Sequence, residues 1–200
     1  MQTFDHFAVS AATLDDGRAH VERALGGVLR PGGRHGLMGT HNLLAGLGKG
    51  EYFEVIAVDP EATPPARPRW FDMDRRAGPP RLSNWIVRTD DIDALVARHP
   101  EAGRPLALSR GDFRWRMAVP EDGVLPFDGC FPALIQWDSP APVFPDSGLR
   151  LTRLSLTHPE GDRLAEILAE LIDDPRIEVS TGPRALTARL DTPDGPRVLE

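Results

Sequence analysis

The sequence has very little cysteine and lysine: its 200 residues include one of each, Cys130 and Lys49. A single thiol cannot form an internal disulfide. Because this composition fits a reducing compartment, we expect a cytoplasmic protein. No apolar run is long enough to span a bilayer, and no basic and then apolar secretory leader opens the sequence. We therefore expect no membrane partner.

A net positive charge is also lacking. The formal net charge is −7, which argues against nucleic acid as a partner. All but one of the 23 basic residues are arginine. An anion bound by this protein is therefore expected to contact arginine guanidinium groups or backbone amides.

The sequence contains the same order of predicted elements twice. Each time, a strand is followed by a helix and then by three strands. Alternating apolar residues predict the strands, and apolar stripes at helical spacing predict the helices. The order indicates an α+β protein built from repeated βαβββ modules. The predicted strands are 3–9, 28–30, 40–47 and 52–58 in the first pass and 82–87, 106–110, 113–119 and 133–137 in the second, with helices ending near 25 and 98.

A proline-rich connector separates the two passes, and a third pass follows them. Proline at this density cannot continue a helix or a central strand. Trp70 and Phe71, inside the connector, are expected to attach it to a domain surface. The predicted organisation is a first module at 1–60, the connector at 61–80, a second module at 81–147 and a third, incomplete module at 148–200.

Because two modules form a cup, the third module cannot form one by itself within its own chain. Two roles follow from this. It pairs with a partner chain, which makes a homodimer, or it caps one edge of the sheet.

Several short segments over the first 140 residues, taken together and in order, resemble one known family. They are Asp5-His6, Gly32-Gly33-Arg34-His35, Gly39-Thr40-His41-Asn42, Tyr52-Phe53-Glu54, Trp85, Arg88-Thr89-Asp90-Asp91, Ser109-Arg110, Arg114-Trp115-Arg116, Phe131-Pro132 and Gln136-Trp137. The sequence is similar here to the glyoxalase-like domain proteins of the vicinal oxygen chelate superfamily, which includes glyoxalase I, extradiol dioxygenases and antibiotic-resistance proteins. The resemblance implies a cup-shaped, curved mixed sheet with its helices outside.

The same resemblance implies a metal position inside the cup, with ligands from the first and last strands of each module. His6 and Glu54 match the two positions of the first module, and Asn84 and Gln136 look like those of the second. An imidazole and a carboxylate suit a divalent Zn, Fe, Ni or Mn ion. Neutral amides are poor ligands for these metals. The alternative is that His6 and Glu54 only hydrogen-bond each other in the core.

Further residues are candidates for binding a substrate. Strand alternation allows only one of His41 and Asn42 to face the cup, and the resemblance favours Asn42. His35 lies in a glycine-bounded loop as a rim residue or a ligand. Between 113 and 119 an apolar face, expected to meet the helix, alternates with a basic face that carries Arg114 and Arg116. If that basic face lines the cup, it suits a carboxylate or carbonyl oxygens.

Two hypotheses of function follow. In the first, the protein binds a small organic acid or carbonyl compound in the cup and is a lyase or isomerase, with Glu54 as the proton-transfer carboxylate and His6 as its metal co-ligand or orienting partner. In the second, it is a metal-free protein of the resistance type that binds or sequesters a small molecule without catalysis. Asn84 and Gln136 favour the second. Ring cleavage is disfavoured because two histidines and a carboxylate cannot be assembled from the matched positions.

Overall fold

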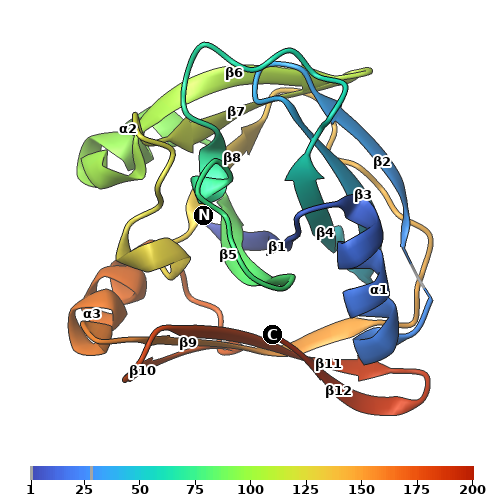
Figure 1. Cartoon of the computed structure of the whole chain (residues 1–200). Coiled ribbons are helices and arrows are strands. Elements are labelled where there is room, and N and C mark those ends of the chain that lie inside the picture. Colours follow the sequence, from blue (N-terminus) through green and yellow to red (C-terminus); the bar gives the residue numbers. More distant parts are fainter. Residues whose placement is uncertain (1, 28) are drawn as a thin grey trace.

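The computed structural model describes residues 2–27 and 29–200. The elements of these residues form three groups with the same order along the chain (Figure 1). The first group is β1 (Thr3–Ser10), α1 (Leu14–Leu25), β2 (Arg30–His35), β3 (Thr40–Gly48) and β4 (Glu51–Val58). The second is β5 (Arg81–Arg88), α2 (Ile92–Arg98), β6 (Arg104–Arg110), β7 (Phe113–Val119) and β8 (Ala133–Trp137). The third is β9 (Arg150–His158), α3 (Gly161–Leu171), β10 (Ile177–Thr181), β11 (Ala185–Thr192) and β12 (Gly195–Leu199).

Val28, where a strand was expected to start, lies outside the described residues; β2 begins at Arg30. Helix α1 begins where the sequence has a capping residue: the Thr13 side chain accepts a hydrogen bond from the Asp16 amide at 3.1 Å. Three short 3₁₀ turns complete the elements, at Trp70–Asp72, Pro100–Ala102 and Phe127–Gly129.

The first two groups share one eight-stranded sheet of order β2-β3-β4-β1-β5-β8-β7-β6. Strands β1 and β5 pair antiparallel at its centre and join the two modules edge to edge. Each first strand also pairs in parallel with the last strand of its own module, β1 with β4 and β5 with β8. The sheet curls so far that its edge strands β2 and β6 come into contact. The expected α+β fold of βαβββ modules around a cup is confirmed.

The third group forms a separate four-stranded sheet of order β10-β9-β11-β12. Here β9 pairs in parallel with the next strand, β10, and β12 lies at the edge beside β11. The third unit therefore repeats the order of elements but not the topology of the first two. It forms a layer against the outer face of the large sheet rather than along its edge, with α1 contacting both β4 and β12 (Figure 1).

Two apolar clusters hold these layers. The outer cluster contains residues of both sheets, among them Phe53, Trp85, Leu154 and Leu190. The inner cluster fills the cup and includes Trp70 and Phe71 from the connector. These two rings were expected on a domain surface, but they are buried inside the cup because its aromatic lining offers them the larger apolar contact. No helix in the described ranges is long and apolar enough to cross a membrane.

Candidate functional site

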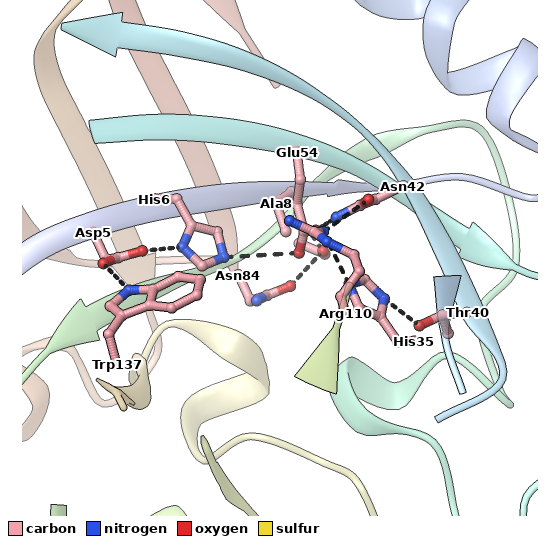
Figure 2. Close-up of polar contacts among 11 residues, drawn as sticks. Asp5, His6, Ala8, His35, Thr40, Asn42, Glu54, Asn84, Arg110 and Trp137 are labelled. Carbon is pink, nitrogen blue, oxygen red and sulfur yellow. Dashed lines mark hydrogen bonds and ion pairs between the residues drawn. The ribbon is translucent and has the colours of Figure 1, made fainter. Parts of the chain in front are cut away.

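The register of three adjacent strands brings Glu54 and Asn84 to the same face of the sheet. Ala8 on β1 pairs with Glu54 on β4 and with Asn84 on β5. Residues paired across strands share a face, and here that face lines the cup, since Ala8 belongs to the inner apolar cluster. Figure 2 shows the short Ala8 side chain beside Glu54, with Asn84 on the neighbouring strand.

Glu54 is held on one side only. It is 5% exposed, and its Oε2 accepts a hydrogen bond of 2.6 Å from Asn42 Nδ2. Its Oε1 lies 3.8 Å from His6 Nε2, too far for a hydrogen bond. One carboxylate oxygen is therefore fixed while the other faces the imidazole and the chamber.

His6 is oriented by Asp5. The Nδ1 atom of His6 lies 2.6 Å from Asp5 Oδ1, and the imidazole stacks on Tyr52 with the ring centroids 4.2 Å apart. Because an ionised carboxylate only accepts hydrogen bonds, this contact places a proton on Nδ1. In the neutral imidazole Nε2 is then an acceptor aimed toward Glu54.

Asp5 is fully buried, and its other oxygen accepts hydrogen bonds from Arg88 Nε at 2.6 Å and Trp137 Nε1 at 3.0 Å. Burial by itself raises the pKa of Asp5. The contact with His6, the positive charge of Arg88 and the Trp137 N–H outweigh it and lower that pKa below its ordinary value. The carboxylate that orients His6 is therefore stable in its ionised form.

Arg110 reaches the opposite side of the cluster from the far edge of the sheet. Its Nη1 donates a 3.2 Å hydrogen bond to Asn42 Oδ1 and lies 3.4 Å from His35 Nε2. His35 also contacts Thr40 Oγ1 through Nδ1 at 3.0 Å. Complete burial, and then the charge of Arg110, lower the pKa of His35 to about 3, so this imidazole is neutral. The approach needs a glycine, because a Cβ at Gly33 would lie 2.7 Å from Arg110 Cδ.

The chamber beside these groups is small and has aromatic walls. It leaves about 20 Å³ of free space, enough for one water molecule. Trp70 and Phe71 stack on each other with centroids 5.0 Å apart, and His35 packs edge-on against Trp70. Burial, together with the nearby Asp5 and Glu54, raises the pKa of Tyr52 well above its ordinary value. The Tyr52 phenol is therefore neutral.

Asn84 is the one predicted amide of the second module that reaches the cup. It is 1% exposed, and its Oδ1 accepts a 2.8 Å hydrogen bond from Ser83. Its Nδ2 is buried and has no hydrogen-bond partner among the residues that the structure describes. An unpaired buried donor is costly unless a ligand or water satisfies it.

Three other predicted substrate-binding side chains lie outside the cup. The apolar face of β7, with Trp115 and Met117, points into the cup, so Arg114 and Arg116 point away from it. Arg116 Nη1 donates to Asp93 of α2 at 2.6 Å, and Arg114 is exposed. Gln136 lies on the same outer face, where its Oε1 accepts a 2.9 Å hydrogen bond from the Ile92 amide at the start of α2.

The register also corrects the match of Gln136 to Glu54. If Asn84 corresponds to His6, then the Ala8–Glu54 pair of the first module corresponds to the Ile86–Ala133 pair of the second. Ala133 has no group that can bind a metal or a substrate polar atom. The matched residue, Gln136, and the residue that the register indicates, Ala133, are three positions apart. The sequence alone does not show the register of strand pairing, so it could not reveal this difference.

Asp5 and Arg110 belong to the site, although neither was predicted as a site residue. Strand alternation would place Asp5 opposite to His6, but a register shift in the β1–β5 pairing between Phe4 and His6 breaks that alternation. Arg110 was quoted as part of the family resemblance, and its contacts depend on the closure of the sheet.

The donor set does not fit a transition-metal site. His6 Nε2 and Glu54 Oε1 are near each other, but an open site needs about three protein ligands. Among the described residues no group of three His, Cys, Asp or Glu side chains is placed to hold an ion. The second module supplies only Asn84 and Ala133, and Asn42 already occupies the second oxygen of Glu54.

Comparison with known families decides the membership of this chain. The model of the glyoxalase-like domain matches residues 4–172. The chain belongs to the glyoxalase-like domain family. The resemblance of the short sequence segments is thereby confirmed, and it extends into the third unit as far as the end of α3. None of the curated proteins matches this member of the family.

Solved structures are similar to this glyoxalase-like protein at low sequence identity. A hypothetical protein from Staphylococcus aureus is 15% identical, covers 100% of this chain and 86% of its own, and has a TM-score of 0.59. Methylmalonyl-CoA epimerase from Mycobacterium tuberculosis is 19% identical over 70% of this chain and 88% of its own, with a TM-score of 0.41. The Streptomyces coelicolor methylmalonyl-CoA epimerase, in complex with 2-nitronate-propionyl-CoA, is 18% identical over 68% of this chain and 97% of its own, with a TM-score of 0.44.

Proposed function

We propose that this protein binds a small organic acid or carbonyl compound in the cup and moves a proton at the carbon next to the carbonyl group. Glu54 is the base. One observation carries this proposal: Glu54 is buried, Asn42 holds its Oε2, and its Oε1 faces the chamber without a hydrogen bond. A fixed carboxylate with one free oxygen is the arrangement that general base catalysis needs.

The proton taken from carbon forms a bond to Glu54 Oε1, and the electron pair of the C–H bond moves toward the carbonyl oxygen of the substrate. Asn84 Nδ2, across Ala8 from Glu54, is the free donor for that oxygen. A preorganised donor of this kind stabilises the negative charge that develops on oxygen. Return of the proton to carbon completes an isomerisation or precedes loss of a leaving group.

His6 assists by accepting the proton from Glu54 when the two groups approach. The Asp5 contact keeps hydrogen on Nδ1 and leaves Nε2 as the acceptor. The resulting imidazolium is stabilised by the buried Asp5 carboxylate. No step requires a metal, which agrees with a donor set that provides only His6 and Glu54.

The second candidate is a protein that binds the same compounds without chemistry. The observation that favours it is the filled chamber, where Trp70 and Phe71 leave about 20 Å³ beside Glu54. A binding protein requires only that a ligand displace Phe71. Catalysis requires in addition that the ligand reach Glu54 Oε1.

Exchange of carbon-bound hydrogen with solvent distinguishes the two candidate functions. In deuterium oxide, the wild-type protein is expected to exchange the α-hydrogens of pyruvate, 2-oxobutyrate or 4-oxopentanoate, followed by proton NMR. Glu54→Gln removes the base and is expected to slow that exchange about 100-fold or more. Glu121→Gln, on an exposed loop, is the matched control and is expected to exchange like the wild type. Equal exchange by Glu54→Gln and Glu121→Gln would exclude Glu54 as the base, and binding without exchange favours the second candidate.

A further inference from the structure

A second and larger cavity adjoins the chamber on the other side of Phe71. Its volume is about 460 Å³, and Phe71 lines both spaces. Asn84 and Ser83 of β5 form part of its wall. Arg184, from the loop between β10 and β11, closes it from the third unit. The cavity therefore lies where the cup, the connector and the third unit meet.

Three guanidinium groups, of Arg76, Arg81 and Arg184, line this cavity without carboxylate partners. Among the described residues none of the three forms an ion pair, and their hydrogen bonds go to backbone carbonyl groups. Arg184, for example, donates to Ser83 O at 2.9 Å and to Asp128 O at 3.1 Å. Arginines that lack a carboxylate partner leave their charge available to an anion.

Two carboxylates also border the cavity, but each has another partner. Asp72 accepts a 2.6 Å hydrogen bond from Arg75 Nε, and Asp128 lies 3.4 Å from His158 Nε2. The Asp72 side chain is 47% exposed and that of Asp128 is 73% exposed. Neither of them replaces an anion at the three arginines.

Burial and the charge of Arg81 destabilise the charged forms of Arg76 and Arg184. Burial, and then the charge of Arg81, lower the pKa of Arg76 against a smaller opposite effect of Asp16. Burial and the charge of Arg81 also lower the pKa of Arg184, against smaller opposite effects of Cys130 and Asp128. The Nε of Arg76 is moreover buried and finds no hydrogen-bond partner within residues 2–27 and 29–200. A bound anion would relieve both the repulsion and the missing contact.

The unpaired Nδ2 of Asn84 is a second, independent indication of a ligand. Asn84 lines this cavity and pairs with Ala8, whose other neighbour is Glu54. The backbone gives a third: Phe71, Asp72 and Asp128, all at the cavity, have φ values of 58°, 56° and 52°. Such strain in residues other than glycine occurs preferentially at binding and catalytic sites.

We propose that Arg76, Arg81 and Arg184 bind a carboxylate or phosphate group of the substrate, whose carbonyl end reaches Asn84 in the same cavity and extends past Phe71 to Glu54. The substrate class is therefore a carbonyl compound with an anionic group at its other end. The position assigned to the carbonyl end rests on the proposed function. The binding of the anionic group in the cavity is independent of the proposed function.

Titration of the protein with two probes at low ionic strength tests the anion site. Calorimetry with 4-oxopentanoate and, separately, with inorganic phosphate is expected to show saturable binding of at least one probe. That result also distinguishes a carboxylate from a phosphate. Arg81 is exposed and donates a hydrogen bond to the Ala77 carbonyl, and Arg81→Gln is expected to weaken the binding of the probe at least tenfold. Arg189→Gln, an exposed arginine of the third unit, is the matched control.

The side-chain amide of Asn84 provides a local readout. In ¹⁵N-labelled protein its NH₂ signals, assigned by Asn84→Ala, are expected to shift on addition of the probe that binds. Absence of binding by both probes at 50 mM, or equal affinity of Arg81→Gln and Arg189→Gln, would overturn the anion site. Glu54→Gln is expected to bind the probe as the wild type does. A loss of exchange with retained binding therefore tests the base apart from the anion site.

Discussion

Asp5 links three other side chains, and together the four come from three strands. His6, Arg88 and Trp137 all hydrogen-bond to it, and its own side chain is fully buried. A carboxylate in such a position orients the imidazole and joins β1, β5 and β8. Its loss removes both effects, and the two can be measured separately.

Replacement of Asp5 by Asn is expected to lower the free energy of unfolding at pH 7 by about 3 kcal/mol, because it leaves Arg88 without its buried partner. The pKa of Asp5 is lower in the folded protein than its ordinary value of 3.8. Its charge therefore stabilises the fold above pH 3.8, and that stabilisation disappears as the pH falls through the lower, folded-state pKa.

Urea denaturation of the wild type and Asp5→Asn at several pH values checks this. The difference in unfolding free energy is expected to be largest at neutral pH and to shrink below about pH 4. Asp173→Asn, at an exposed aspartate, is the control and is expected to change stability by less than about 0.5 kcal/mol. A difference that does not depend on pH would contradict the ionised state of Asp5.

At the level of single residues, strand alternation predicted which side chains share a face but not which face is inside. It grouped Arg114 with Arg116 correctly, and it separated His41 from Asn42, whose side chain does reach Glu54. The basic face of β7 was placed in the cup, although it lies against α2. The choice depends on the aromatic lining of the closed cup, a tertiary property that a single strand does not record.

At the level of elements, the order of strands and helices could be predicted because each module carries the period of its own elements. The pairing of strands in the third unit could not be predicted from the sequence. By the order of elements β12 is equivalent to β4, yet β9 pairs with β10 and β12 is left at the edge. The order of elements restricts but does not determine which strands become neighbours.

The small sheet is expected to contribute strongly to stability, since its inner residues share the outer cluster with the large sheet. Leu154 on β9 has no exposed surface. Leu154→Ala is expected to lower the free energy of unfolding by about 3 kcal/mol through the cavity that it leaves. Guanidinium denaturation measures this.

Leu37→Ala is the matched control, because Leu37 is 49% exposed. Its effect is expected to stay within about 0.5 kcal/mol. Equal stability of the two variants would show that the small sheet does not depend on its contact with the large one.

At the level of the whole molecule, a cluster shared by both sheets predicts one cooperative unfolding transition. The four tryptophans lie between residues 70 and 137, so their fluorescence reports on the connector and the second module. Far-ultraviolet circular dichroism reports on both sheets. The two midpoints in denaturant are expected to coincide, and separate midpoints would show that the third unit unfolds independently.

The position of Phe71 has a consequence for how this protein can diverge. The free space beside Glu54 is limited by a connector that forms no strand of the sheet, so substitutions between residues 61 and 80 can widen or narrow the chamber while the strand register stays the same. The size of the compound that the cup accepts can therefore change without any change at the reacting groups. Exchange of this one segment between members of the family would transfer ligand size separately from chemistry.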